Sequence, residues 1–564
     1  MNELPDEGNR LVVDSDSTLT IDEGETVECA GELFVQPNGV SAPKVEIINF
    51  GFLKFSNFIN CSSSNLVIKN YGTLIFQNTI LELTGEYGKV EFSNSGNFQI
   101  QNSTFDGNYG GTFNINSTSG NLVVTDSHFD VSGSSHGKCS ELDVKTNNST
   151  WEECTFNANG AIINYLNNGN LTFQNAHIQL SGWANATIEN EDILTLNDVN
   201  IQVYTGYMYI NNNGTLNSHN LYVKDQNDGT WITNYKDASF SESTFVANGA
   251  AGQINIYSSD KLQLHHASFD VNYGGSITLN AAMGNLLVTD SSLDVSGSSH
   301  GKYSYLNIIA DNATWENCLF NNNAARTNYL NSKELNLYNC TINNVGTGPS
   351  TVMSNFGSWV FDKGSISGSG TISISCSKSS ELIDCTFNSS GSLTLINRED
   401  LVTKNWQVKT TATEANINIL NEENGTLTFD KSFIENVSVE TLAAIGPEGR
   451  QFTEVSGGTI TVTNNGEMQL QSNPQPSPEP TPTPTTQTTP SPTQSPQTSP
   501  QNSLEPTPTS QTTTESTQTP QSTQNNIEGS SDSNFTSIIA IVTAIIIIII
   551  VVMFVRKKQA KSEQ

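Results

Sequence analysis

Four aspartates form the pattern in this chain that is best suited to chemistry. Asp106 and Asp130 each follow a large apolar residue by one position, and Asp270 and Asp294 repeat the arrangement later in the sequence. If those apolar residues stack in successive layers of strands, the two carboxylates of each pair lie about one strand spacing apart, ~4.8 Å. Such a pair can hold a cation such as Ca²⁺, or act as the acid and nucleophile of a retaining glycosidase.

A solvated acidic surface is the alternative explanation of the same four residues. His136–Lys138 and His300–Lys302 follow the second aspartate of each pair and supply the only nearby bases. We therefore treat the four aspartates as candidate cation sites. We predict no catalytic residue, and no cofactor other than Ca²⁺ at these positions.

Other motifs for chemistry are weaker. The sequence has no Gly-rich phosphate loop, no paired-Cys metal knuckle, no helical His motif and no nucleophile elbow. His265 and His266 are adjacent in the sequence. Because alternate side chains of a strand point to opposite faces, we do not expect these two histidines to share a metal.

Aromatic residues gather near the middle of the chain. Trp183, Tyr204, Tyr207 and Tyr209 could stack on sugar rings, because Tyr and Trp combine a large apolar face with a polar group. Packing between adjacent coils is the alternative role for the same rings. We keep these four residues as candidate glycan-stacking groups.

The elements that position these residues recur at a regular interval. In Phe98–Phe105 two apolar residues alternate with polar ones, and one large apolar anchor residue follows a short polar step. The interval between anchors averages about 23 residues, and a period in the 20s made of short β-like pieces is the signature of a solenoid. The predicted anchors are Phe58, Ile80, Phe105, Phe129, Phe156, Ile178, Ile201, Leu221, Phe245, Phe269, Leu293, Phe320, Ile342, Ile366, Phe387, Trp406 and Phe433.

Alternation of apolar and polar residues has the period of a strand rather than that of a helix. One short strand cannot bury its apolar side alone, so successive coils must stack in parallel. We predict an all-β fold, a parallel β-helix of roughly 16–18 rungs. The main alternative is a β-propeller, whose blades need about 40–50 residues each, about twice the interval between anchors. Asparagines at the bends are expected to bond along a column, at Asn78, Asn102, Asn175 and Asn200.

A longer repeat lies on top of the short one. The segment Val124–Lys138 returns almost unchanged as Val288–Lys302, and the same shift carries Trp151 onto Trp315. The shift equals about seven rungs, and a solenoid tolerates such a copy because each rung contacts only its neighbours. We predict an internal duplication of about residues 101–166 and 265–330.

Composition limits the classes of partner. The net charge is −32, and only 14% of the residues are charged. Nucleic acid is excluded as a partner, because its phosphates would need a basic face. An acidic surface of this kind can attract cations, and it also keeps a protein soluble.

The C-terminal part of the chain differs in composition from the repeats. Residues 473–537 are rich in Pro, Thr, Ser and Gln and predict a disordered stalk after an ectodomain at 1–472. Residues 538–555 are almost all Ile, Val and Ala, which predicts one transmembrane helix. The basic tail at 556–564 then places the C-terminus in the cytoplasm and the ectodomain outside, as in a type I membrane protein.

Two further features are consistent with an extracellular location. Asn-x-Ser/Thr sequons recur along the chain, for example at Asn60 and Asn213, and predict a glycoprotein. The chain has 8 cysteines. Cys318 and Cys340 fall on adjacent rungs, where they could form a disulfide or fill a small slot as buried thiols.

Residues 11–471 resemble the right-handed parallel β-helix, or pectin-lyase-like, superfamily in period and composition. The stalk, the apolar span and the Lys-rich tail resemble archaeal cell-surface proteins of the adhesin type. The resemblance implies a β-helix on a membrane anchor, and the superfamily's catalytic residues have no matching positions here. We therefore expect a non-enzymatic surface protein that presents a rigid β-helix for adhesion, glycan binding or envelope structure, with the membrane and glycans or envelope proteins as partners. The alternative is a membrane-tethered polysaccharide lyase or hydrolase.

Overall fold

The computed structural model describes residues 3–39, 42–85, 88–108, 110–135, 138–299, 302–346, 351–430, 432–434, 445, 450–453 and 459–470. All regular structure in these ranges is β-strand. None of the described residues forms a helix with the length and apolar character that a membrane crossing requires. The predicted stalk, transmembrane helix and basic tail lie outside the described residues.

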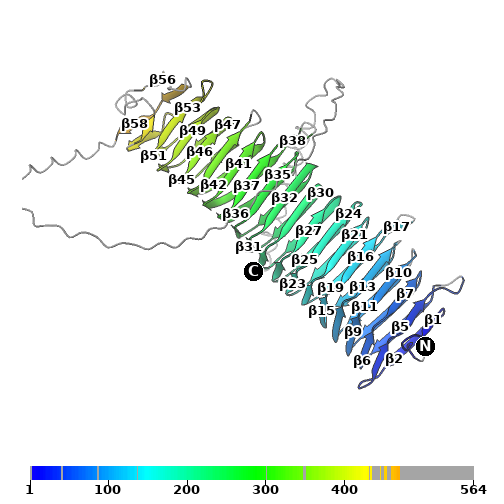
Figure 1. The fold of residues 1–564 in the computed structure, drawn as a ribbon. Helices are drawn as coiled ribbons and strands as arrows, with labels where there is room; N and C mark the ends of the chain where they lie inside the picture. Colours follow the sequence, from blue (N-terminus) through cyan, green and yellow to red (C-terminus); the bar gives the residue numbers. More distant parts are fainter. Residues whose placement is uncertain are drawn as a thin grey trace, which may run out of the picture. The chain divides into compact units, whose positions relative to one another are not determined.

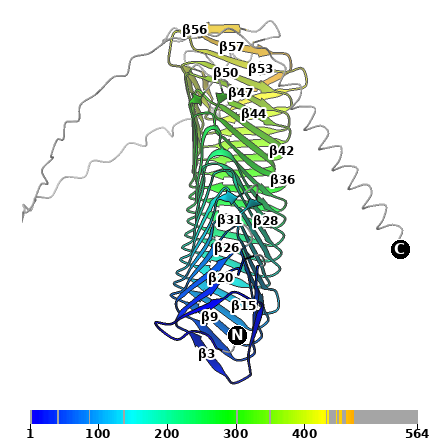
Figure 2. The same ribbon diagram turned by 90° about the vertical axis from the view of Figure 1, so that its right-hand side faces the viewer.

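Short parallel strands build a solenoid of about 17 turns, which Figures 1 and 2 show from two sides. The prediction of a parallel β-helix is therefore confirmed. Each turn crosses three faces of the solenoid, and most turns have one strand on each face. One turn comprises β11 (Lys89–Asn94) on the first face, β12 (Asn97–Gln101) on the second and β13 (Thr104–Asn108) on the third. The next turn comprises β14 (Thr112–Ser117), β15 (Asn121–Thr125) and β16 (His128–Ser132).

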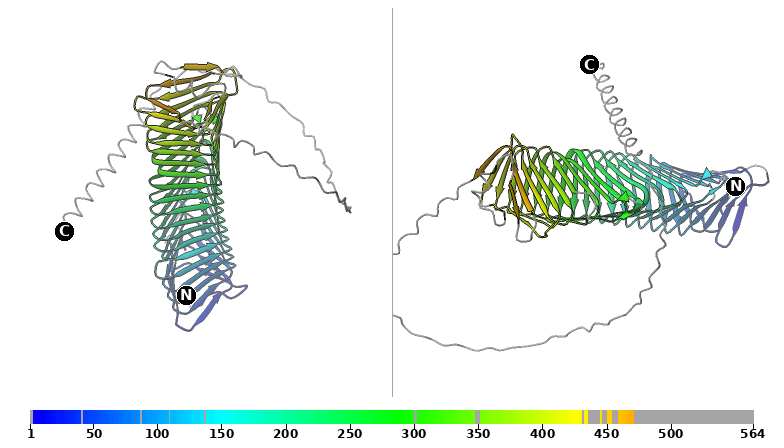
Figure 3. Two further views of the ribbon diagram at one scale, coloured as in Figure 1. Left: turned by 90° about the vertical axis from the view of Figure 1, so that its left-hand side faces the viewer. Right: turned by 90° about the horizontal axis from the view of Figure 1, so that it is seen from above.

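Strands of the same face pair in parallel from one turn to the next, for example β11 with β14, β12 with β15 and β13 with β16. Figure 3 shows the turns following one another along one axis, from the N-terminal strands to β56–β58 (Arg450–Thr453, Thr459–Asn464 and Glu467–Leu470). Side chains at the same position on neighbouring turns therefore form columns. Along each strand, these columns lie alternately inside the solenoid and on its outer surface.

Apolar residues fill the interior columns. In β13 the side chain of Phe105 is buried, whereas its neighbour Asp106 points outward. The Phe105 ring stacks on Phe129 with centroids 5.0 Å apart, and Phe129 stacks on Phe156 at 5.3 Å. These contacts confirm the predicted stacking of one anchor on the next.

Four predicted anchors are wrong, because a residue one or two positions later occupies the interior column, and the side chain of a fifth, Phe433, lies outside what the structure describes. Ile80 pairs with Thr104 on the outer surface and is 49% exposed. Leu221 and Trp406 are buried, but at the bend position before the third-face strand, where other turns have small residues. The column itself contains Ile59 in place of Phe58, Leu81 in place of Ile80, Val223 in place of Leu221 and Val408 in place of Trp406.

A left-handed bend joins the second face to the third. The same bend position has φ near +50° in turn after turn, at Asn78, Asn102, Asp126, Glu153, Asn175, Asp198, Asn220, Glu242, His266, Asp290, Asn317, Asn339, Lys363, Asp384 and Asn405. Asn and Asp tolerate this region better than most residues, which explains their frequency there. The side-chain Nδ2 of Asn102 donates to Oδ1 of Asn78 at 2.7 Å, as predicted for the bend column. Asn200 does not belong to it; it begins β27 (Asn200–Val203), and the bend residue is Asp198.

A second asparagine column lies inside the solenoid and was not predicted. Asn167, Asn190, Asn212 and Asn234 are buried where first-face strands end. The Nδ2 of each donates to Oδ1 of the next at 2.6–2.7 Å. A buried amide without hydrogen-bond partners would destabilise the fold. The column supplies such partners to the asparagine amides that are buried where the first face ends.

The cysteines do not pair. All 8 are free thiols, and both Cys318 and Cys340 are buried. The alternative of buried thiols that fill a small slot is therefore confirmed, and the disulfide between these two is not formed.

A buried polar cluster distinguishes the first copy of the duplicated block from the second. Tyr165 accepts a hydrogen bond from Nε1 of Trp151, and its hydroxyl also bonds those of Ser149 and Thr146. In the second copy Trp315 and Tyr329 are retained, but the counterparts of Thr146 and Ser149 are Ala310 and Ala313. Among the residues that the structure describes, none bonds the buried Nε1 atom of Trp315.

We predict that Tyr165→Phe lowers the free energy of unfolding by about 1–3 kcal/mol, because it removes the acceptor of the buried Trp151 indole N–H and one hydroxyl partner of Ser149. Tyr329→Phe is the matched control, and it should cost less because alanines replace both hydroxyl partners. Urea denaturation followed by tryptophan fluorescence measures both variants. Equal losses in the two copies would contradict the hydrogen-bonded role of Tyr165.

Candidate functional site

The structure brings the predicted aspartates together in pairs on the third face. Asp106 of β13 pairs in register with Asp130 of β16. Asp270 of β35 (Ser268–Asn272) pairs in the same way with Asp294 of β37 (Ser292–Ser296). All four side chains point outward and are partly exposed. The register therefore creates the acid pairs that the sequence suggested, whereas whether they bind a cation stays a prediction.

The first pair belongs to a larger acidic column. Glu82 of β10 (Ile80–Thr84) is the register partner of Asp106, so three carboxylates follow one another along the solenoid. His128 stands beside them, with Nε2 3.9 Å from Oδ2 of Asp130. Glu82 and His128 are absent from the predicted set, although Glu82 precedes Asp106 by the length of one turn.

Partial burial raises the pKa of Asp106, and the negative charges of Asp130 and Glu82 raise it further. The nearby His128 and a hydrogen bond from the Asn108 side chain act in the opposite direction. In the second copy Asn272 donates to Asp270 at 2.8 Å, and Asn321 donates to Asp294 at 2.6 Å. Asparagine amides thus already occupy part of each acid pair.

The predicted bases lie at the edge of what the structure describes. His136, Gly137, His300 and Gly301 fall outside the described residues. Their segments contain two small antiparallel hairpins, β17–β18 (Ser134–Ser135 and Lys138–Cys139) and β38–β39 (Ser298–Ser299 and Lys302–Tyr303). Among the described residues, His128 is the histidine that forms an ion-pair contact with Asp130.

Three aromatic rings meet on the first face. Tyr207 and Tyr209 lie on β28 (Gly206–Asn212), and Trp231 lies on the next strand, β30 (Tyr222–Asn234), as the register partner of Tyr209. The Tyr209 and Trp231 rings stack with centroids 5.0 Å apart and planes 13° apart, and Tyr207 lies 5.9 Å from Trp231. We call Tyr207, Tyr209 and Trp231 the aromatic patch.

Gly229 makes room for the Trp231 ring. It is the register partner of Tyr207, and a Cβ at this position would come within 2.1 Å of the indole. Any other residue would push the indole away, so the patch depends on this glycine. Trp231 is absent from the predicted set, although it follows Tyr209 by 22 residues, one turn of the solenoid.

Uncharged polar side chains flank the aromatic patch. Thr187 is the register partner of Tyr209 on one side, and Asn255 is the partner of Trp231 on the other. All of these side chains point outward from the sheet and are partly exposed. Aromatic faces with a few amide and hydroxyl groups form a common type of ligand-binding surface.

The other two predicted aromatic residues lie apart from this patch. Trp183 is 72% exposed at a bend, and among the described residues it makes no ring contact with the patch. The hydroxyl of Tyr204 donates to Oε1 of Gln202 at 2.7 Å on the third face. Two of the four predicted residues therefore come together, and the other two do not.

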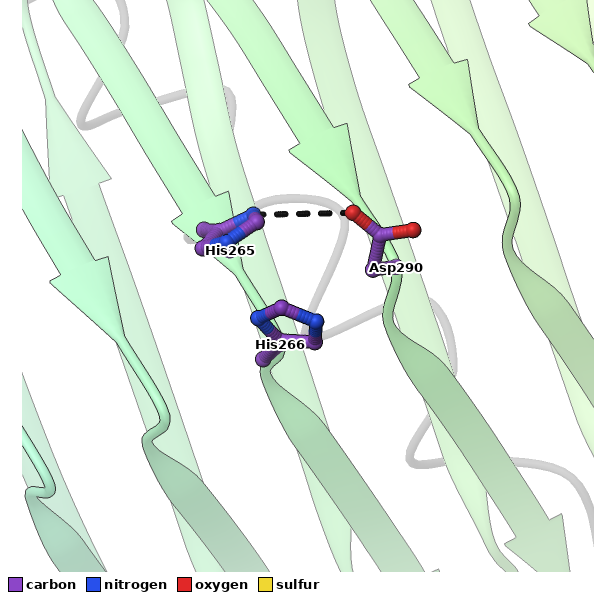
Figure 4. A group of neighbouring side chains, drawn as sticks. All are labelled: His265, His266 and Asp290. Carbon is purple, nitrogen blue, oxygen red and sulfur yellow. Dashed lines mark ion pairs between the residues drawn. The ribbon is translucent and has the colours of Figure 1, made fainter.

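The expectation that the adjacent histidines point to opposite faces is wrong. His265 ends β34 (Lys261–His265), but His266 occupies the left-handed bend with φ +48°. The strand alternation stops at that bend, so both rings point outward with centroids 4.0 Å apart. Figure 4 shows the two imidazoles on the same side of the chain, facing Asp290 of the next turn.

No protein-family model matches the chain, and no match is found among curated proteins.

We predict that Asp130→Asn lowers the pKa of Asp106, because it removes the charge that opposes ionisation of that carboxyl. Carboxyl NMR titration of protein labelled at aspartate measures the shift. Asp143→Asn, on the first face, is the control and should leave the Asp106 titration unchanged. An unaltered Asp106 pKa in Asp130→Asn would show that the charge of Asp130 does not contribute to the shift.

Proposed function

We propose that this chain is a non-enzymatic, membrane-anchored surface protein whose β-solenoid binds glycans through the aromatic patch. The apolar segment at 538–555 and the basic residues after it support the membrane anchor. The resemblance of the stalk and tail to archaeal adhesin-type surface proteins supports the same location. The parallel solenoid would serve as a rigid support that holds a binding face outside the cell.

The stacked Tyr209 and Trp231 rings are the observation that carries the proposal. A pyranose ring has an apolar face of C–H groups and a rim of hydroxyls, so it needs an aromatic surface beside hydrogen-bonding groups. The aromatic patch supplies the first, and Thr187 and Asn255 supply the second. The flanking groups are uncharged, which favours neutral sugars over charged ones.

A polysaccharide-cleaving enzyme is the second candidate, and the acidic column favours it. Asp106 has a raised pKa beside the carboxylate of Asp130, and pairs of carboxyls with different pKa values can divide the roles of acid and base. Against this role, Asn108 already donates to Asp106 and Asn321 to Asp294, so the carboxyls are engaged within the column. The aromatic patch lies on another face, so the two candidates can be tested separately.

We predict that Trp231→Ala weakens glycan binding at least tenfold, about 1.4 kcal/mol. The purified full-length chain is screened against soluble neutral oligosaccharides, and calorimetry of the best ligand then compares the variants. Trp183→Ala is the control, because it removes a more exposed indole that lies outside the patch.

The same samples are assayed for released sugar products. Binding without product, lost in Trp231→Ala and kept in Trp183→Ala, supports the proposed function. Product release that disappears in Asp130→Asn would overturn it in favour of the enzyme. Binding that is equal in both tryptophan variants would remove the aromatic patch as the site.

A further inference from the structure

A cluster of three potential metal ligands lies at the bend between the second and third faces. His265 and His266 come from one turn and Asp290 from the next (Figure 4). Each residue offers one ligand atom, and these atoms all lie within 4.8 Å of one another. Nδ1 of His265 is 3.7 Å from Oδ2 of Asp290. All three side chains are exposed, so an ion could reach them from solvent.

The backbone of the bend explains why the three side chains converge. His266 and Asp290 occupy the same left-handed position on successive turns, with φ of +48° and +51°. The parallel ladder sets Asp290 beside His266, because Thr289 at the end of β36 (Ser276–Thr289) is the register partner of His265. The placement comes from the repeat itself and needs no special loop.

Hydrogen bonds around the cluster leave the facing carboxylate oxygen available. Oδ1 of Asp290 accepts a hydrogen bond from Nδ2 of Asn317 at 2.9 Å, which fixes the carboxylate and leaves Oδ2 directed at His265. The Asn317 amide is a partner of the kind that commonly holds a metal ligand in position. The Thr289 hydroxyl lies 2.7 Å from Nδ1 of His265, the nitrogen that faces Asp290, so a metal bound at Nδ1 would displace this hydroxyl.

We propose that His265, His266 and Asp290 bind a divalent transition-metal ion of the Zn²⁺ class. Two imidazoles and one carboxylate suit Zn²⁺, Cu²⁺ or Ni²⁺, whereas Ca²⁺ prefers a larger set of oxygen ligands. Three protein ligands leave at least one coordination position open to water or to a ligand from another molecule. The site is separate from the acid pairs and the aromatic patch, and it does not depend on the proposed glycan binding.

The duplicated block supplies an internal comparison for this site. In the first copy the positions of His265, His266 and Asp290 are held by Gln101, Asn102 and Asp126. Asn102 and Asp126 adopt the same left-handed bend, with φ of +44° and +50°. The same backbone therefore accommodates residues without imidazole, and the first copy lacks the two nitrogen ligands.

The test is a double variant, His265→Gln with His266→Asn, that converts the second copy to the residues of the first. Because the first copy folds with these residues, the variant should retain the solenoid, and circular dichroism checks this. We expect the full-length chain to bind one Zn²⁺ at this site in calorimetry, and the double variant to bind it at least about 100-fold more weakly, since loss of even an outer partner costs 10–100-fold. Asp126→Asn, in the first copy, should leave the affinity unchanged.

Cu²⁺ electron paramagnetic resonance gives a second readout. The wild-type chain should show coupling to two imidazole nitrogens, and this signal should vanish in the double variant. Excess Ca²⁺ should displace neither metal. Failure of the wild-type chain to bind Zn²⁺, or unchanged Zn²⁺ affinity in the folded double variant, would overturn the proposal.

Discussion

Main-chain hydrogen bonds between successive turns fix the register of this solenoid, and the other features of the structure depend on that register. Because the pairing is parallel, each outward residue stands beside the residue one turn later. Asp106 meets Asp130, Tyr209 meets Trp231, and His266 meets Asp290 for the same reason. Outward side chains therefore form columns along the solenoid. Two residues one turn apart are neighbours in such a column, although more than 20 positions separate them in the sequence. Insertion of a single residue into a strand would move its outward side chains to the interior face.

The bends allow this register to continue from turn to turn. The left-handed bend between the second and third faces leaves the strand pairing parallel. It interrupts the alternation of inward and outward side chains along the chain. Inside the solenoid, the buried asparagine column satisfies amide groups at another corner, with Nδ2 to Oδ1 bonds from Asn190 to Asn212 and from Asn212 to Asn234. Each such bond contributes about 1 kcal/mol, and the cost of an unpaired buried amide is larger. The two columns of polar side chains are thus part of what holds neighbouring turns together.

The period and alternation in the sequence were sufficient to predict the fold, because parallel stacking is the one arrangement that buries the apolar side of every short strand. They did not determine which of two neighbouring apolar residues faces inward, so Phe58 and Ile80 were taken for anchors in place of Ile59 and Leu81. The acid pairs were predictable because both members of each pair directly follow a large apolar anchor, one turn length apart. Trp231 and the histidine cluster were not. The position of Trp231 beside Tyr209 depends on the register between two strands of different length. The histidine cluster depends on a positive φ, which interrupts the alternation of inward and outward side chains.

The duplicated block shows how such a scaffold can diversify. The two copies share their backbone bends and buried tryptophans, whereas the polar cluster around Tyr165 and the histidines at the bend each occur in one copy. The first difference lies in the interior and the second on the surface, and a solenoid tolerates both because each turn contacts only its neighbours. A crystal structure of the chain with a bound neutral oligosaccharide tests the glycan-binding account most directly. The account predicts an intact sugar against Trp231 and Tyr209, with hydroxyls directed at Thr187 and Asn255. A sugar bound along the acidic column of Glu82, Asp106 and Asp130, or found cleaved there, would contradict it.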